Sequence, residues 1–288
     1  MKITRRQLLV RTASAASALG ASAGLYTWLV EPHWLEIVER PLPIRFLPKG
    51  LEGRTLALLT DLHVGPRVDD DYITGVFDRV AALAPDVVVI SGDLISYEGS
   101  SSFERLARVL ARAPRGRLAS VSTLGNHDYG FGWSQPEVAD RVAATVRQAG
   151  FNVLRNETME LGGLQIAGLD DLWGKRFDPM RAFATIDSRR AVIALSHNPD
   201  TVDHPGWQRF SGWILAGHTH GGQCKPPFLP PPLLPVTNRR YTSGEFEVGN
   251  GRMLYISRGV GHLTKVRFNA RPEVTMFTLT ANDAAVPS

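Results

Sequence analysis

Five short apolar segments of the chain each end in a cluster of Asp, Asn, His and Gly residues, and this arrangement constrains the fold more than any other feature. The first segment covers residues 55–60 and is followed by Asp61-Leu-His63. Buried strands that lead into functional loops have this pattern. The other four clusters are Gly92-Asp93, Gly125-Asn-His-Asp128, His197-Asn198 and Gly217-His-Thr-His-Gly-Gly222.

The segments between these clusters predict helices in the first half of the chain and strands in the second. Helical spacing of apolar residues predicts helices at 69–84, 103–113 and 135–149, with strands at 86–90 and 118–123. A first half of βαβ type followed by a strand-rich half favours an α/β fold with stacked sheets. Beyond residue 152 the predicted strands are 159–161, 164–169, 191–196, 212–216, 245–248, 253–257 and 274–280.

The clusters carry the donor atoms of a metal centre. Asp61 and His63 are two positions apart, as are His218 and His220, and in extended backbone this spacing puts both side chains on one side. Loops that leave the carboxyl ends of strands converge on one crevice. One such motif alone is more typical of a turn or a helix cap, but five in order predict a site for one or two divalent cations. His33 and His204 are assigned no role.

The ordered motifs resemble the calcineurin-like metallophosphoesterase family over about residues 56–222. The resemblance implies a four-layer α/β/β/α sandwich, with two mixed sheets flanked by helices, and a two-metal site. It implies that His127 is a proton donor to the leaving oxygen. The implied ligands are Asp61, His63 and His220 for one cation, Asp93 between both, and Asn126, His197 and His218 for the second.

The chemistry that this resemblance implies is hydrolysis of a phosphodiester or a pyrophosphate. Two cations about 4 Å apart hold the attacking and leaving oxygens of a phosphoryl transfer, and a hydroxide between them is the nucleophile. Asp, Asn and His ligands accept Mn, Fe and Zn alike, so the sequence leaves the metal open. Three alternatives remain open: a lipid-linked pyrophosphatase of the UDP-diacylglucosamine type at the membrane surface, a metal-retaining envelope protein without catalysis, and a binuclear hydrolase of amides or lactones.

Two departures from the family pattern bear on function. The chain lacks the Asp-Arg pair that follows Gly92-Asp93 in the family's phosphoprotein phosphatases, which disfavours a phosphoprotein substrate. Ser96 stands where those enzymes place an acid behind the catalytic histidine, here His127. Asp128 is expected to orient a neighbouring group or to cap the segment that follows it.

Fewer sequence features indicate which residues contact the substrate. Arg239 and Arg240 are candidates for binding a second phosphate or another anion. The Pro-rich apolar segment 226–235 is expected either to pack on the core or to form a lip for an acyl chain or a membrane surface. Asp170-Asp171 is interpreted as a turn near the cleft.

The first 30 residues predict an export signal. They contain Lys2, Arg5, Arg6 and Arg11 without any acid, and an apolar run rich in Ala, Ser and Gly follows. Arg5-Arg6 resembles the twin-arginine signal, so the expected partner is the twin-arginine export machinery. The expected location is the periplasm or the extracytoplasmic face of the membrane. Cleavage of this leader and its retention as a membrane anchor both stay open. Residues 1–30 are thus taken as leader and 31–288 as the metallophosphoesterase domain.

Charge and cysteine content bear on the expected partners and on covalent cross-links. The chain has 32 basic and 28 acidic residues, and without the four basic residues of the leader the two signs balance at 28 each. A body without net charge has no bulk attraction to nucleic acid, so no nucleic-acid partner is expected. The single cysteine, Cys224, excludes an internal disulfide. The sequence does not indicate an oligomeric state.

Overall fold

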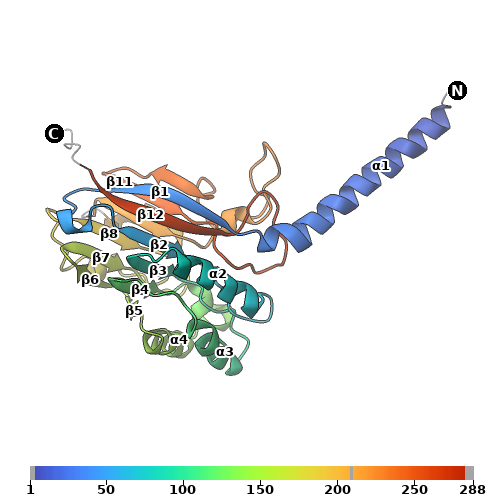
Figure 1. Cartoon of the computed structure of the whole chain (residues 1–288). Coiled ribbons are helices and arrows are strands. Elements are labelled where there is room, and N and C mark those ends of the chain that lie inside the picture. Colours follow the sequence, from blue (N-terminus) through green and yellow to red (C-terminus); the bar gives the residue numbers. More distant parts are fainter. Residues whose placement is uncertain (1–3, 208–209, 283–288) are drawn as a thin grey trace.

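Two six-stranded sheets packed face to face form the centre of the molecule, in a computed structural model that describes residues 4–207 and 210–282 (Figure 1). The helices are α1 (Arg5–Leu25), α2 (Asp70–Ala82), α3 (Ser101–Leu110), α4 (Pro136–Gln148) and α5 (Pro179–Ala182). The strands are β1 (Glu36–Ile44), β2 (Thr55–Leu59), β3 (Val87–Ser91), β4 (Ala119–Thr123), β5 (Asn152–Val153), β6 (Glu157–Leu161), β7 (Leu164–Gly168), β8 (Val192–Leu195), β9 (Gly212–Ala216), β10 (Gly244–Glu247), β11 (Arg252–Ile256) and β12 (Glu273–Ala281).

Both sheets are mixed. The first has the order β1-β12-β2-β3-β4-β5, in which β2 to β5 run parallel and β12 runs antiparallel to β2. The second has the order β10-β11-β9-β8-β7-β6, with parallel strands in the middle and antiparallel strands at both edges. Each sheet therefore presents several parallel carboxyl ends at one edge, as the predicted site requires.

The alternation of side chains along each strand divides the core into layers. Leu56 and Leu58 of β2 face the second sheet, whereas Ala57 and Leu59 face the helices. Successive side chains of a strand point to opposite faces, so a strand buried on both faces needs apolar residues throughout. This explains why the central strands consist of unbroken apolar runs.

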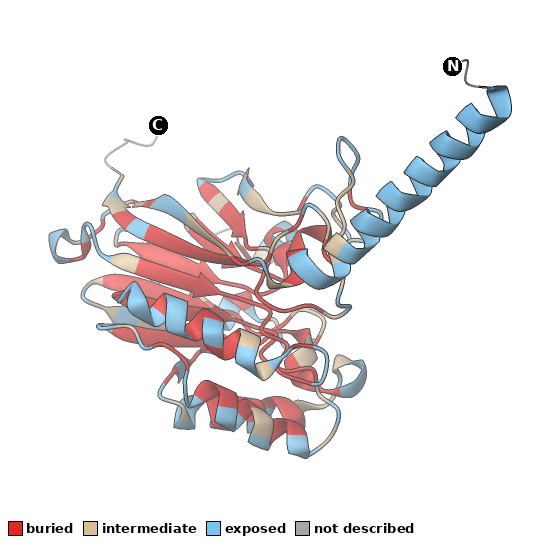
Figure 2. Ribbon diagram, turned by 45° about the vertical axis from the view of Figure 1, so that its right-hand side comes forward, coloured by how far each residue is buried: buried red, intermediate tan, exposed pale blue. Residues whose placement is uncertain are grey.

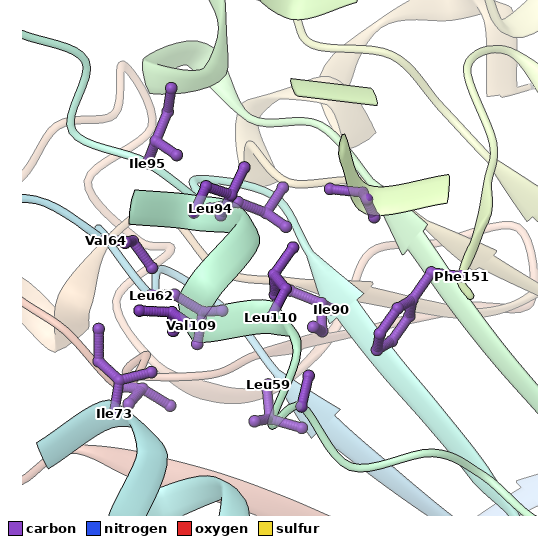
Figure 3. Packing of buried hydrophobic residues seen from close by; sticks show 14 of the residues in the cluster. Leu59, Leu62, Val64, Ile73, Ile90, Leu94, Ile95, Val109, Leu110 and Phe151 are labelled. Atoms are coloured by element: carbon purple, nitrogen blue, oxygen red, sulfur yellow. The ribbon is translucent and has the colours of Figure 1, made fainter. Parts of the chain in front are cut away.

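The outer layers differ in thickness. Helices α2, α3 and α4 cover the first sheet, and Figure 3 shows side chains such as Ile73, Leu110 and Phe151 packed together in this layer. In the described part of the chain, the second sheet is covered more thinly, by α5 and single helical turns around the buried Trp207. The predicted four-layer fold, with two mixed sheets flanked by helices, is confirmed.

Strand β1 was not predicted, and its prolines explain why. Pro41 and Pro43 lie inside the strand and cannot donate hydrogen bonds, which argues against a strand when the sequence is considered alone. Proline is tolerated on an edge strand, and β1 is an edge strand that pairs in parallel only with β12.

Helix α1 extends away from the sandwich, and every one of its residues is exposed (Figures 1 and 2). With the turns that follow it, the helical segment Arg5–His33 is long and apolar enough to cross a membrane. Its foot nevertheless belongs to the folded body. The carbonyl of Thr27 accepts a hydrogen bond from Arg267 N, and the buried Glu31 carboxylate accepts one from Ala270 N at 2.7 Å.

Candidate metal centre

All five polar clusters lie at the carboxyl ends of parallel strands and meet at one end of the sandwich. They follow β2, β3 and β4 in the first sheet and β8 and β9 in the second. Backbone hydrogen bonds hold the loops to one another. Asp61 N donates to Gly92 O and His63 N donates to Asp93 O. In the second sheet, Gly217 N donates to His197 O. The clusters therefore form a single crevice.

Asp61, His63 and His220 bring one ligand atom each to a common point. The Nε2 atoms of His63 and His220 are 3.1 Å apart, and His220 Nε2 lies 3.4 Å from Asp61 Oδ1. All three side chains are buried. Ligand atoms about 2.1 Å from one cation are about 3 to 3.5 Å from each other, so this spacing fits a single ion.

Asp93, His197 and His218 form a second group of the same kind. Their ligand atoms lie within 4.8 Å of one another, and Asp93 Oδ2 is 3.1 Å from His197 Nε2. The imidazole rings of His197 and His218 meet edge to face, with centroids 5.2 Å apart. The two groups use the same residues that the sequence assigned to two cations.

Asp93 joins the two groups. Its Oδ1 accepts a hydrogen bond from the backbone N–H of His127 at 2.9 Å, which leaves Oδ2 directed at the ligands. That oxygen lies 3.1 Å from His197 Nε2 and 3.6 Å from His63 Nε2, one nitrogen from each group. This geometry suits a carboxylate that bridges two cations.

Hydrogen bonds to the outer nitrogens orient two of the imidazoles. His197 Nδ1 lies 2.8 Å from the carbonyl oxygen of Ser91, and His218 Nε2 lies 2.7 Å from that of Pro235. A carbonyl oxygen only accepts, so these nitrogens carry the protons and donate them. The remaining nitrogens, Nε2 of His197 and Nδ1 of His218, keep the lone pairs that a metal needs.

Burial keeps most of the histidines neutral. It lowers the pKa of His218 to about 3 and lowers the pKa values of His63 and His220 well below the usual range. The buried guanidinium of Arg267, 3.3 Å from Nδ1 of His220, lowers the pKa of that histidine further. Neutral imidazole is the form that binds metal.

His197 is the exception. Burial alone lowers its pKa, but the carboxylates of Asp93 and Asp61 outweigh burial and raise it to about 10. Burial likewise favours a raised pKa for Asp93, yet the positive charge of His197 lowers it well below the usual range. In the metal-free protein a proton on His197 thus partly neutralises the negative charge of the two carboxylates.

Unpartnered buried atoms show that the residues fit a cation pair. Among the described residues, both polar atoms of the Asn126 amide and Nε2 of His197 lie buried without a hydrogen-bond partner. His197 Nε2 lies 3.1 Å from Asp93 Oδ2 and so pairs with that carboxylate by charge when it is protonated. A buried polar group without a partner costs about 1 to 3 kcal/mol, and a cation ligated by these atoms removes that cost.

His127 lies at the edge of the cluster and is half-buried. Its ring meets the ring of His63 edge to face, with centroids 5.0 Å apart, and meets Trp133 at 6.0 Å. This position places the imidazole beside the ligands and next to solvent, where a proton donor to a leaving group has to be.

Ser96 and Asp128 both contact groups on other loops, which for Asp128 agrees with the expected orienting role. The hydroxyl of Ser96 lies 3.2 Å from Nδ1 of His63, so it supports a ligand and does not stand behind His127. Asp128 does not cap the segment that follows it. Its carboxylate accepts hydrogen bonds from the backbone N–H groups of Leu94, Ile95 and Gly125, which ties the loop after β3 to the loop after β4.

The arginine pair has partners within the protein. A guanidinium nitrogen of Arg239 donates to the Pro231 carbonyl at 2.7 Å, and one of Arg240 donates to the Glu247 carbonyl at 3.0 Å. These contacts brace the loop around the Pro-rich segment. Anion binding by Arg239 and Arg240 stays a prediction.

Asp170 and Asp171 lead into the expected turn, at residues 172–175, and Asp171 also lies close to the site. Asp171 Oδ1 accepts from Gly174 N at 2.7 Å, whereas its buried Oδ2 has no hydrogen-bond partner among the described residues. Burial raises the pKa of Asp171 to about 7. The next aromatic residue, Trp173, meets the ring of His218 edge to face at 4.5 Å.

Sequence reasoning missed the loop that follows β11. Gly261 N donates to the Asp61 carbonyl, and a Cβ at Gly259 would lie 2.7 Å from Cβ of Asp61, so the glycines allow this loop to approach the cluster. Arg267, fully buried and close to His220, was also missed. A glycine-rich segment after a predicted strand was the signal for the loop, whereas nothing near Arg267 in the sequence marks it.

Comparisons with known proteins agree with this geometry. Residues 54–222 match the family model described as calcineurin-like phosphoesterase. The chain is 33% identical to the uncharacterised metallophosphoesterase YkuE of Bacillus subtilis, over 96% of this chain and 98% of that protein. It is 30% identical to the phosphodiesterase YaeI of Escherichia coli, over 96% and 99%. It is 28% identical to the UDP-2,3-diacylglucosamine pyrophosphatase LpxG of Chlamydia trachomatis, over 92% and 96%.

Proposed function

Since the chain belongs to the calcineurin-like phosphoesterase family, whose enzymes hydrolyse phosphoesters with two metal ions, we propose that it cleaves a phosphodiester or a pyrophosphate in the cell envelope. The observation that carries the proposal is the convergence of Asp61, Asp93, His197 and His220 in one buried crevice from loops of both sheets. Turns and helix caps do not bring buried carboxylates and imidazoles from different loops together.

The side chains have distinct roles in the proposed reaction. Asp61, His63 and His220 would hold one cation, and Asn126, His197 and His218 would hold the other, with Asp93 between the two groups. Two divalent cations bound there supply charge that makes water acidic near neutral pH and that offsets the charge on the phosphate.

The proton balance of the reaction involves His127. Water adds its oxygen to phosphorus, and the bond between phosphorus and the leaving oxygen breaks. His127 gives its proton to that leaving oxygen, while the proton lost by water returns to the protein or to solvent. The products are a phosphomonoester and an alcohol from a diester, or two phosphate groups from a pyrophosphate.

An activity panel tests the proposal. Protein loaded with Mn²⁺, Zn²⁺ or Fe²⁺ is expected to hydrolyse bis(p-nitrophenyl) phosphate and to lose this activity after chelation. An amide and a lactone assayed beside it separate the phosphoesterase from a binuclear hydrolase of carbonyl compounds. Metal-replete, folded protein that leaves every phosphoester intact would instead support a metal-retaining binding protein.

A lipid-linked pyrophosphatase at the membrane surface is the second candidate. Phe228, Leu229 and Leu233 are exposed on the Pro-rich segment next to the metal centre, and a relative over most of the chain is a UDP-2,3-diacylglucosamine pyrophosphatase. A detergent-dispersed lipid pyrophosphate compared with a water-soluble diester separates the two candidates. The preferred substrate is the one with the larger kcat/KM.

We also propose that residues 1–30 direct export through the twin-arginine pathway and that residues 31–288 are the catalytic domain. The support is the Arg5-Arg6 pair, the absence of acid before the apolar run and the exposure of α1. Replacing both arginines with lysine is expected to leave the protein in the cytoplasm. Protease added to spheroplasts measures this, and digestion of the double variant to the same extent as the wild type would refute the proposal.

A further inference from the structure

An apolar groove lies directly beside the metal centre. It has a volume of about 500 Å³ and is walled by three segments, 219–224, 232–235 and 263–266. Its apolar lining includes Leu233, Leu234, Leu263 and Val266. Pockets of this size are typical of small-molecule sites.

The walls of the groove are fixed in place by hydrogen bonds. The Gln223 side chain donates to the carbonyls of Thr264 and Val266, both at 3.2 Å, and accepts from Leu263 N. These bonds satisfy the polar atoms of Gln223 within the protein. What faces the cavity is therefore mostly hydrocarbon, and the groove exists before any ligand arrives.

The groove and the metal centre share one residue. His220 belongs both to its wall and to the first group of ligands. The Pro235 carbonyl, in the opposite wall, accepts the hydrogen bond from His218. A molecule whose phosphate lies between the ligands thus has the groove next to that phosphate.

The groove also adjoins the foot of the candidate membrane helix. Val266 lines the groove, and the next residue, Arg267, donates its backbone N–H to the carbonyl of Thr27 just after α1. If α1 spans a membrane, the groove is close to the lipid surface.

We infer that this groove binds the hydrocarbon chain of an amphiphilic phosphoester while the phosphate lies at the metal centre, which rests on the proposed function. Apolar lining selects a hydrocarbon, and the shared His220 requires that the hydrocarbon be joined to a phosphate. The adjoining helix foot favours a lipid as the source of that chain over a free apolar metabolite.

The single cysteine of the chain gives a direct test, because Cys224 lines the groove. Full-length protein in phosphatidylcholine vesicles is treated with a charged, water-soluble maleimide at mildly alkaline pH, and labelling is followed by mass spectrometry. Hexadecyl phosphate in the vesicles is expected to slow labelling about tenfold, the factor for a ligand at about ten times its dissociation constant. Butyl phosphate and inorganic phosphate should leave the rate unchanged.

Variants from two walls keep the test falsifiable. Leu234→Glu and Leu263→Glu, each a groove residue, are expected to abolish protection by hexadecyl phosphate. Leu83→Glu, at an exposed leucine outside the groove, should retain it. Equal protection by butyl phosphate, or protection that survives in both groove variants, would overturn the inference.

Two further measurements separate this inference from the proposed function. The protection experiment is run on metal-loaded protein, and the same preparations are assayed with bis(p-nitrophenyl) phosphate. Turnover without chain-dependent protection means that the groove inference is wrong and the function stands. Protection without turnover of any phosphoester means that the proposed function is wrong and the groove inference stands.

Discussion

At the scale of single residues, the most unusual feature is the backbone of the ligands. Asp61, His63, Asp93, His218 and His220 all have positive φ angles, between 49° and 72°. Side chains other than Gly and Asn rarely adopt this region, and each such residue costs about 1 to 3 kcal/mol. The cross-linked loops of the crevice hold these residues in the strained conformation, so the folded body arranges the ligands itself.

The role of His127 leads to the first prediction. His127→Gln is expected to lower kcat by about 10²- to 10⁴-fold on a diester with an alkyl leaving group, because that oxygen needs a proton. The loss should be much smaller with p-nitrophenolate, which leaves without one. Metal content, measured by mass spectrometry, should equal that of the wild type.

An equal loss on both leaving groups would refute this role. So would loss of metal from the variant, because it would make His127 a ligand. Trp133→Phe, a change next to His127 that keeps an aromatic ring, is the matched control and should alter both rates little.

The pKa of His197 leads to a prediction about pH. Its raised value, about 10 against 6.5 in an unfolded chain, means that the folded protein binds this proton more tightly. The stabilisation is complete below pH 6.5 and is lost as the pH rises toward 10. Chelated protein is therefore expected to unfold at lower temperature at about pH 9.5 than at pH 7, measured by calorimetry.

Metal should reverse this trend, because a bound cation takes the place of the proton. Protein loaded with Mn²⁺ is expected to show no such fall between the same two pH values, and chelated His197→Gln should show a much smaller fall than the chelated wild type. A chelated wild type whose unfolding temperature rises over this range would contradict the charge assignment.

At the scale of elements, each functional loop depends on a close approach between chain segments. Gly125 follows β4 and has an ordinary φ of −111°, so its backbone does not require glycine. The space around it does, because a Cβ would lie 2.7 Å from Cδ2 of His197 and closer still to the Asp93 carboxylate. The loop after β4 can therefore reach the second group of ligands only without a side chain.

Gly125→Ala is thus expected to weaken metal binding by about 10- to 100-fold, as loss of a partner behind a ligand does. Titration with Mn²⁺ measures this. Gly75→Ala is the control, since Gly75 lies on the exposed face of α2 with no neighbour within 4 Å. The control should raise stability by about 0.5 to 1 kcal/mol with unchanged metal affinity. Unchanged affinity in Gly125→Ala would show that the crevice is not tightly packed.

The foot of α1 supports a further prediction. Glu31→Ala leaves the buried N–H of Ala270 without its acceptor, at an expected cost of about 1 to 3 kcal/mol in the free energy of unfolding. Urea unfolding of the full-length protein in detergent measures it. Glu31→Gln keeps an acceptor oxygen and should cost less. Equal stability of the alanine variant and the wild type would mean that the foot contributes nothing to the fold.

The elements also show what the sequence can and cannot predict. Strand β3 was predictable because it is a continuous apolar run. Helix α2 was predictable because its apolar residues recur at helical spacing. Strand β1 was not, because its prolines obscure a strand that only its position at the sheet edge permits. The partners of Ser96 and Asp128 were not predictable, because they lie on other loops and local sequence does not contain those contacts.

At the scale of the whole molecule, the sandwich explains why scattered motifs form one site. Parallel strands of both sheets end at the same side, so loops between residues 61 and 220 meet there. The rule that polar clusters follow strand ends was enough to predict which residues gather. It was not enough to predict Arg267 or the groove, because both depend on how the segment after β11 folds back over the crevice.

The central claim, a cation pair held between the two sheets, is tested most directly by anomalous diffraction from crystals grown with Mn²⁺. The account predicts two peaks about 4 Å apart. One should lie among Asp61, His63 and His220, the other among Asn126, His197 and His218, with Asp93 between them. A single peak, or peaks away from these side chains, would contradict it.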